Sequence, residues 1–188
     1  MNIWELWVNE DYNNAFLIDE KGNQQYEKGF DFKEIKSDPY TRELNIEIRK
    51  KGFPDIMNYW GIQGSCIVSA KVKRIIETCF ENLRIQFIPC HSRRFSDIEM
   101  WILNVCEYHD VLDADKSNCQ LTNNFKGEQV IKYVKDYAFI QEAFKFDMFK
   151  IYLNGIKRST HLFVSDRFKT IMEENGVTGL ALEKVYSI

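Results

Sequence analysis

Apolar and polar positions follow the same order in two stretches of the chain, residues 67–89 and 163–185. In each, a short apolar run ends at a serine, Ser69 or Ser165, and apolar side chains then recur every three or four positions. This spacing is typical of the buried face of a helix, and a serine before the first turn can accept from a free backbone N–H. Gly176 then predicts the end of the second helix. We expect two strand–helix–strand repeats; the pattern leaves open whether they arose by duplication or independently.

Alternation predicts further strands around these units. Residues 3–8 and 146–153 fit strands. Residues 98–108 are apolar on both faces, which is typical of a strand that is central in its sheet or covered on both sides. Residues 118–128 are polar and are expected to form a loop. Residues 130–144 fit both a helical stripe and strand alternation, and we favour a helix there. Strand runs with a few short helices predict an α+β fold with a mixed or antiparallel sheet.

The length of 188 residues is that of a single domain. We divide it into a variable, aromatic-rich N-terminal part, residues 1–60, and a remainder, residues 61–188, that contains both units. The apolar residues at 56–60 are expected to form one helical turn. Trp4 and Trp7 lie three positions apart, so in a strand they fall on opposite faces. At least one of them is therefore expected to be exposed or to lie at an interface.

The charge and the cysteines restrict the partners and the compartment. A net charge of −3 gives no electrostatic reason to expect nucleic acid or an anionic membrane as a partner. The five cysteines are odd in number and widely spaced, which indicates a reducing compartment without a disulfide framework. The first residues lack the features of a signal peptide, and the longest uncharged run, residues 56–70, is too short and too polar to span a membrane. We expect a soluble, cytoplasmic protein.

The densest group of potential metal ligands lies between Cys106 and Cys119. Cys106 and His109 have the spacing of one pair of zinc ligands. Asp113 and Cys119 are the nearest candidates for the other two ligands of such a site. Cys106 belongs to an apolar strand and no second closely spaced pair follows it. We therefore expect a core cysteine beside a surface histidine, and no metal or other cofactor.

The remaining histidines do not form a recognisable catalytic group. Cys90 and His91 are adjacent in a strand, so their side chains point to opposite faces and do not readily form a thiolate and its base. His161 lies at the return of a hairpin and is expected to be exposed. We expect no catalytic residues.

Three motifs, in their order along the chain, resemble a family of bacterial immunity proteins from polymorphic toxin systems, formerly known as a domain of unknown function. The first is IVS at residues 67–69 with its helix and the strand that ends at Ile88-Pro89. The second joins WILNV and DVLDADKS within residues 101–117, and the third is FVSDRFKTIMEENGVTGL at residues 163–180. The resemblance covers residues 62–188. It implies a protein made beside a toxin, which binds and blocks that toxin by stoichiometric occlusion in the producing cell and its kin, and which is not an enzyme.

The resemblance carries no site residues over, so the expected contact surface rests on charge and residue type. Toxin and immunity partners often rely on charge complementarity for fast and selective binding. Reversing the charges of Asp110, Asp113 and Asp115 together is expected to weaken toxin binding without unfolding the protein. The expected partner-binding residues are the acidic residues after the strand at 98–108 and the two N-terminal tryptophans: Glu107, Asp110, Asp113, Asp115, Trp4 and Trp7.

Two other classes of function stay open at this point. A small hydrolase-like enzyme would need a cavity with convergent polar side chains. A structural subunit of a larger assembly would purify with several partners and would neutralise no toxin.

Overall fold

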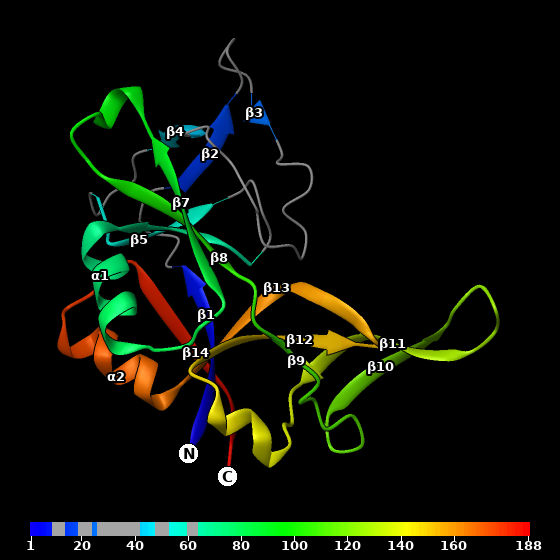
Figure 1. The fold of residues 1–188 in the computed structure, drawn as a ribbon. Coiled ribbons are helices and arrows are strands. Elements are labelled where there is room, and N and C mark those ends of the chain that lie inside the picture. The colour runs from blue at the N-terminus through cyan, green and yellow to red at the C-terminus, as the bar shows by residue number, and fades with distance from the viewer. Residues whose placement is uncertain (9–13, 19–23, 26–41, 48–52, 60–63) are drawn as a thin grey trace.

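The computed structural model describes the chain except for residues 9–13, 19–23, 26–41, 48–52 and 60–63 (Figure 1). Much of the aromatic-rich N-terminal part therefore lies outside the described residues. The described residues form strands and two α-helices, so the α+β class predicted from the sequence is confirmed. The strands make up three sheets, of seven, five and two strands, in place of the single sheet that was expected. Both parallel and antiparallel pairs occur, so the larger sheets are mixed.

The seven-stranded sheet closes on itself, because β2 at one side also pairs with β5 at the other. Its interior holds an apolar core that includes Leu44, Tyr59, Ile67 and Ile102. In spatial order its strands are β3 (Gln24–Gln25), β2 (Asn14–Ile18), β4 (Arg42–Glu47), β7 (Ile85–His91), β8 (Met100–Val105), β6 (Cys66–Ser69) and β5 (Ile56–Tyr59). A 3-10 turn, η1 (Arg93–Phe95), connects β7 to β8.

The five-stranded sheet joins the two ends of the chain. The N-terminal strand β1 lies between β13 and β14 and is antiparallel to both. In spatial order the strands are β14 (Leu180–Ser187), β1 (Asn2–Val8), β13 (Ile156–Ser165), β12 (Met148–Leu153) and β9 (Tyr108–His109). The third sheet is a hairpin of β10 (Asn118–Asn123) and β11 (Gln129–Asp136), and a 3-10 turn, η2 (Gln141–Lys145), follows it.

The two strand–helix–strand units predicted from the sequence are present, one in each large sheet. The first consists of β6, α1 (Ala70–Cys79) and β7, and the second of β13, α2 (Asp166–Glu174) and β14. In each, the two strands of the unit are separated by one antiparallel strand, which is β8 in the first and β1 in the second. The serine caps are also as expected: Ser69 accepts from the backbone N–H of Val72 at 3.4 Å, and Ser165 from that of Phe168 at 3.1 Å.

The correspondence between the units extends to the strand that lies between the two strands of each unit. Trp101 on β8 and Trp4 on β1 pair with the same position of their units, the residue before the serine cap. Each indole ring lies beside a lysine of the neighbouring helix, with 5.3 Å from Lys73 Nζ to Trp101 and 5.2 Å from Lys169 Nζ to Trp4. The two units thus share a local architecture. Their common ancestry stays a prediction.

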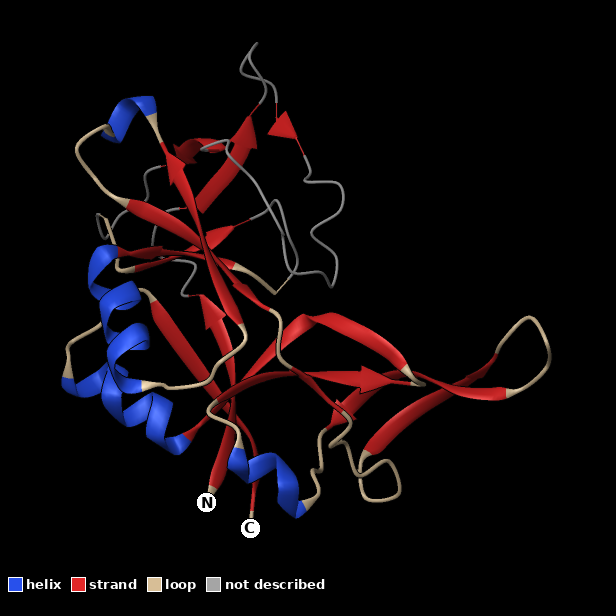
Figure 2. Cartoon of the chain, viewed as in Figure 1, coloured by secondary structure: helices blue, strands red, loops and turns tan. Residues whose placement is uncertain are grey.

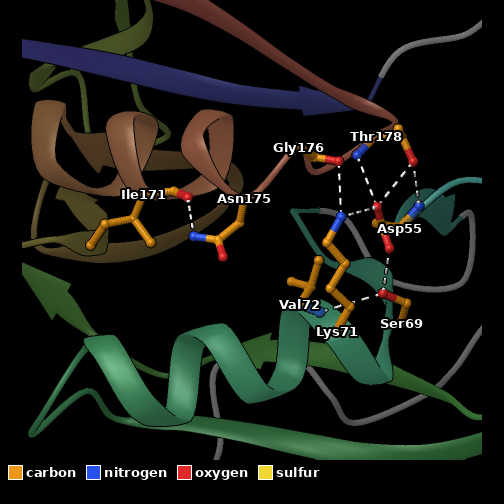
Figure 3. Close-up of polar contacts among 8 residues, drawn as sticks. All are labelled: Asp55, Ser69, Lys71, Val72, Ile171, Asn175, Gly176 and Thr178. Carbon is orange, nitrogen blue, oxygen red and sulfur yellow. Dashed lines mark hydrogen bonds and ion pairs between the residues drawn. The ribbon is translucent and has the colours of Figure 1, made fainter.

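Each serine cap is also held by an aspartate that precedes a neighbouring strand. The Ser69 hydroxyl donates to Asp55 at 2.9 Å, and the Ser165 hydroxyl donates to Asp147 at 2.7 Å. Asp55 further accepts from the backbone N–H and the hydroxyl of Thr178, in the loop after α2 (Figure 3). The Asp55 carboxylate therefore ties the first unit to the second.

The two helices pack against each other in opposite directions and share one core. The rings of Phe80, after α1, and Phe168, in α2, lie 5.5 Å apart. Val72, Ile76 and Met172 are buried in the same cluster. Helix α2 ends as Gly176 predicts: Gly176 has a φ of +58°, and the N–H groups of the two residues after Asn175 bond back into the last turn.

Several sequence predictions are wrong, and most of them lie in or beside the two-stranded hairpin. Residues 118–128 were expected to form a loop but contain β10, and the helix favoured at 130–144 is replaced by β11, a loop and η2. The helical turn expected at 56–60 is strand β5 over its described part. The long strand expected at 98–108 is divided into β8 and β9, and β8 does lie inside its sheet.

Candidate partner-binding site

The β10–β11 hairpin, residues 118–136, projects away from the two large sheets (Figure 2). We call it the arm. Among the described residues its two strands pair only with each other, so neither outer edge of the ribbon is paired with another strand. Leu121 and Tyr133 on its strands are about half exposed, and Phe125 at its tip is 95% exposed. The arm is therefore a protruding surface with large apolar side chains in contact with solvent.

The base of the arm is fixed to the body by a compact network. The Ser117 hydroxyl accepts from the backbone N–H of Ala138 at 2.9 Å and lies 2.7 Å from the carbonyl oxygen of Asp113. The N–H of Asp113 in turn donates to the carbonyl oxygen of Ala138 at 2.9 Å. Ala138 and Phe139 are buried, so the base is anchored in the core beside the five-stranded sheet.

A second attachment lies farther along the arm. The side-chain amide of Asn154, in the turn between β12 and β13, accepts from the N–H of Ile131 at 3.0 Å and donates to its carbonyl oxygen at 2.7 Å. This amide supplies to β11 the pair of hydrogen bonds that a neighbouring strand would supply. The arm is thus held at two points along its length and keeps a defined direction.

The tip of the arm is ordered by Asn124. Its side-chain oxygen accepts from the N–H groups of Lys126 and Glu128, at 2.9 and 3.0 Å, and its amide donates to the Glu128 carboxylate at 2.8 Å. Gly127 adopts a φ of +80°, which only a residue without a Cβ adopts without strain. Phe125 is therefore presented by a closed, hydrogen-bonded turn.

The acidic residues predicted to bind a partner lie between β8 and the base of the arm, in different surroundings. Asp110 and Asp115 are exposed. Asp113 forms an ion pair with Lys116 at 2.8 Å and accepts from its N–H, and these hydrogen bonds lower the pKa of the Asp113 carboxyl. Glu107 lies 2.7 Å from His109 Nε2 and accepts from the N–H of Arg84. Asp110 and Asp115 are thus available to a partner, whereas Asp113 and Glu107 hold the local structure.

The two tryptophans lie on opposite faces of β1, as the sequence predicts. Trp7 is 48% exposed and meets His161 edge to face, with ring centroids 6.4 Å apart. Trp4 faces α2, and its indole N–H donates to Asp166 at 2.8 Å. Hydrogen bonds from Trp4 and Asn2 hold the pKa of the Asp166 carboxyl below its usual value although burial opposes them. Trp7 is therefore the more accessible of the pair.

Beside the base of the arm lies a polar group that sequence reasoning missed. His161 is half-buried, contrary to expectation, and its Nδ1 hydrogen-bonds the carboxylate of Glu5, which is 5% exposed. Tyr137, at the end of β11, lies 5.9 Å from the His161 ring. Burial, and then the charge of Glu5, raise the pKa of the Tyr137 hydroxyl. The alternation of β1 places Glu5 on the same face as Trp7, but nothing in the sequence indicates its distant partner.

The Glu5–His161 pair borders a cleft of about 310 Å³ between β11 and β14. A carboxylate that orients an imidazole is one part of a general-base site. Such a site also needs a nucleophile, and no serine, cysteine or threonine is among the described residues that line this cleft. The pair links β1 to β13, and the His161 ring lies beside both Trp7 and Tyr137, the residue that follows the arm.

The candidate metal ligands do not come together. Cys106 is buried next to β8, and the ring of His109 stacks on Phe146 with centroids 3.5 Å apart. Cys119 lies on β10, where burial raises the pKa of its thiol. Among the described residues no three histidine, cysteine, aspartate or glutamate side chains gather in a way that could hold a metal ion.

Comparison with known families identifies the kind of protein that carries this arm. Residues 9–187 match the model of the Immunity protein family (Imm11). The chain belongs to this immunity protein family. The match confirms the resemblance drawn from the three motifs and extends it across nearly all of the aromatic-rich N-terminal part. A search of curated proteins found no match.

Membership in the Imm11 family implies that the chain binds a toxin protein. The arm and the acidic residues at its base belong to the matched region, whereas Trp7 lies just before it. In the described part of the chain, neither helix has the length or the apolar character needed to cross a membrane.

Proposed function

We propose that this protein neutralises a cognate bacterial toxin by binding it stoichiometrically and covering its active surface. The proposal includes its setting, a polymorphic toxin system in which the protein protects the cytoplasm of the producing cell and its kin. The observation that supports it most is the family match over residues 9–187. It acts as an inhibitor and not as an enzyme, and it uses no cofactor.

The contact surface in this proposal lies around the base of the arm. Asp110 and Asp115 supply negative charge there, and Trp7 supplies an exposed aromatic side chain of the kind enriched in binding hot spots. Asp113 and Glu107 support the loop that carries the acidic residues. Trp4 contributes by fixing β1 against α2 through Asp166.

The test uses the toxin domain encoded beside this protein. The toxin domain is expressed from an inducible promoter with and without the immunity protein, and survival is counted. The purified proteins are then mixed and analysed by size-exclusion chromatography with light scattering. We expect rescue of growth and a single complex with one copy of each protein. An unrelated toxin domain of similar size is the control and should neither be neutralised nor bound.

The other possible results of this experiment contradict the proposal, each in a different way. Growth rescue by substoichiometric amounts of protein, lost in the His161→Ala variant, would point to catalysis by the Glu5–His161 group. Absence of both rescue and complex formation would remove the toxin proposal for this pair. Purification in a fixed complex with several other proteins would support the structural-subunit class.

A further inference from the structure

We propose that the arm inserts its tip into a concave cleft of the toxin, with Phe125 seated in an apolar pocket at the floor of that cleft. This inference rests on the proposed function and names the part of the surface that makes the central contact. The acidic loop and Trp7 then lie at the rim of the interface, around the base of the arm.

The first argument is the exposure of Phe125 on an ordered turn. A phenylalanine that is 95% exposed gains no burial energy in the free protein. A disordered loop could fold its side chain back onto the body, but Asn124 closes this turn through the N–H groups of Lys126 and Glu128. The free protein therefore already holds the backbone at Phe125 in an ordered, outward-facing turn. An apolar anchor that is fixed before binding loses little conformational freedom on association, which favours affinity.

The second argument is the shape of the arm. A two-stranded ribbon that projects from the body is convex on every side, so it fits a groove or cleft better than a flat surface. Its attachments at Ala138 and Asn154 fix its direction. Leu121 and Tyr133 are about half exposed on the strands behind the tip. The arm therefore exposes large apolar side chains both at its tip and along its strands.

The third argument is charge, which selects protein over nucleic acid as the occupant. Of the acidic side chains on the arm, Glu128 is hydrogen-bonded to Asn124, and Asp136 to Asn118. Lys126, Lys132 and Lys135 form no ion pair with the described residues. Lys126 Nζ lies 5.8 Å from the centre of the Phe125 ring, so the arm offers cationic side chains beside its apolar ones. At its base Asp110 and Asp115 are exposed, which would repel a phosphate backbone. We therefore expect a toxin cleft with an apolar floor, carboxylates along its walls and basic residues at its outer rim.

The decisive experiment measures the affinity for the purified toxin domain encoded beside this protein, rendered inactive where needed for expression. Isothermal titration calorimetry compares the wild type with Phe125→Ala and Phe125→Tyr. Truncation of a central aromatic anchor typically costs enough affinity to raise Kd by at least about 30-fold, and we expect this for Phe125→Ala. The tyrosine variant should retain most of the affinity because it keeps the ring.

The matched control is Ile188→Ala, which removes an apolar side chain of 63% exposure outside the arm. It should change Kd by less than about threefold. All three variants should have the thermal unfolding midpoint of the wild type, because the replaced side chains contribute little to any core. A photo-crosslinking residue placed at position 125 should attach to the toxin, and the attached toxin residues should line a cleft.

The outcomes separate this inference from the proposed function. If the wild type and Phe125→Ala bind the toxin equally well, the insertion of the arm is overturned and the proposed function stays intact. Wild type that does not bind overturns both. A wild-type dimer in solution that Phe125→Ala converts to a monomer identifies a second copy as the occupant and overturns the toxin cleft. If Phe125→Ala abolishes binding to a single-stranded RNA and leaves toxin binding unchanged, the insertion into a toxin cleft is overturned in favour of nucleic acid as the occupant.

Discussion

Lys71 and Arg167 hold equivalent places in the first turns of the two helices, and each donates to a carbonyl oxygen at the C-terminal end of the other helix. Lys71 Nζ lies 2.9 Å from the carbonyl oxygen of Gly176, just beyond α2, and Arg167 bonds the carbonyl oxygen of Cys79, the last residue of α1. Carbonyl groups at a helix end lack partners within the helix, and cations are favoured there. Each unit thus supplies a hydrogen-bond donor to the C-terminal end of the other unit's helix. We therefore expect the two large sheets to unfold together.

Asp55→Asn is expected to lower the free energy of unfolding at pH 7 by about 1.5–3 kcal/mol, the usual worth of hydrogen bonds to a charged group. Burial alone would raise the pKa of Asp55, but hydrogen bonds from Thr178, Ser69 and Lys71 hold it below its usual value. A lowered carboxyl pKa contributes stability above about pH 4 that is lost as pH falls through the folded-state pKa. Urea unfolding should therefore show the difference at pH 7 and a smaller one at pH 3. Asp115→Asn, at an exposed site, is the control and should be neutral at both.

Gly179→Ala is expected to destabilise the protein by at least about 3 kcal/mol, because a new Cβ and a strained backbone act together. Gly179 has a φ of +85°, and a Cβ there would lie 2.1 Å from the carbonyl oxygen of Ile56 and 2.7 Å from Pro54. The loop after α2 thus approaches the strand β5 of the seven-stranded sheet too closely for any side chain. Gly155→Ala shares the positive φ but meets nothing within 4 Å, so it should cost only about 1 kcal/mol. Equal losses in the two variants would contradict the close approach.

Lys150→Met is expected to stabilise the protein at pH 7 by about 2–3 kcal/mol, since it removes a buried cation. Lys150 is 1% exposed, and burial lowers its pKa to about 8. Between pH 8 and the unfolded value of about 10.4, the unfolded chain binds a proton that the folded protein has released. The wild type therefore regains stability relative to the variant as pH rises through this range. Burial also raises the pKa of Cys66 to about 12, but this thiol is common to both proteins and does not affect the difference.

Urea unfolding at pH 7, 8, 9 and 10, followed by tryptophan fluorescence, measures the effect of Lys150→Met. The advantage of the variant should shrink steadily and be largely gone at pH 10. An advantage that stays constant over this range would mean that the ammonium group is solvated in the folded protein.

Asp110→Lys combined with Asp115→Lys is expected to weaken toxin binding by about tenfold at low salt, through slower association, because rim charges act mainly on the on-rate. The sequence alone favoured reversing Asp113 as well, but Asp113 holds the turn before the arm through Lys116 and Ser117. Leaving it in place keeps the test free of a folding defect. Association rates by surface plasmon resonance at two salt concentrations provide the measurement. A rate that is the same as that of the wild type at both concentrations would remove the acidic loop from the interface.

Asn124→Ala is expected to weaken toxin binding by several-fold while leaving the thermal unfolding midpoint unchanged. The substitution removes the hydrogen bonds that close the tip, so Phe125 must be ordered during binding and part of the affinity is lost. The arm contributes little to the core, so the body should keep its stability. Amide hydrogen exchange should be faster at Lys126 and Glu128 in the variant. Full affinity together with fast exchange would show that the order of the tip is irrelevant to binding.

The parts of the fold that could be predicted from the sequence are those encoded by neighbouring residues. Ser69, Ser165 and Gly176 act within one helical turn of their own positions, and the predicted caps are found where expected. The arm was missed because a ribbon with water on both faces has no buried face to impose alternation. Val130 and Val134 lie four positions apart and fit a helical stripe equally well.

The candidate site was predictable only where it depends on residue type. Exposed aspartates and Trp7 were identified from charge and alternation. The Glu5–His161 pair and the support of Ser117 by Ala138 join residues that are distant in the sequence, and no local pattern encodes such contacts. The same holds for the pairing of β1 with β13 and β14, which decides where both tryptophans point.

The place of β1 between β13 and β14 has a consequence for biosynthesis. The ribosome releases β1 long before it has made either neighbour, so this strand leaves the exit tunnel with two open edges. Open strand edges are prone to pair with other chains. The seven-stranded sheet, whose described strands all precede β9, can assemble while translation continues, whereas the five-stranded sheet must wait for β14. A nascent chain that stalls before that strand would carry an unfinished sheet and become a natural target for chaperones and proteases.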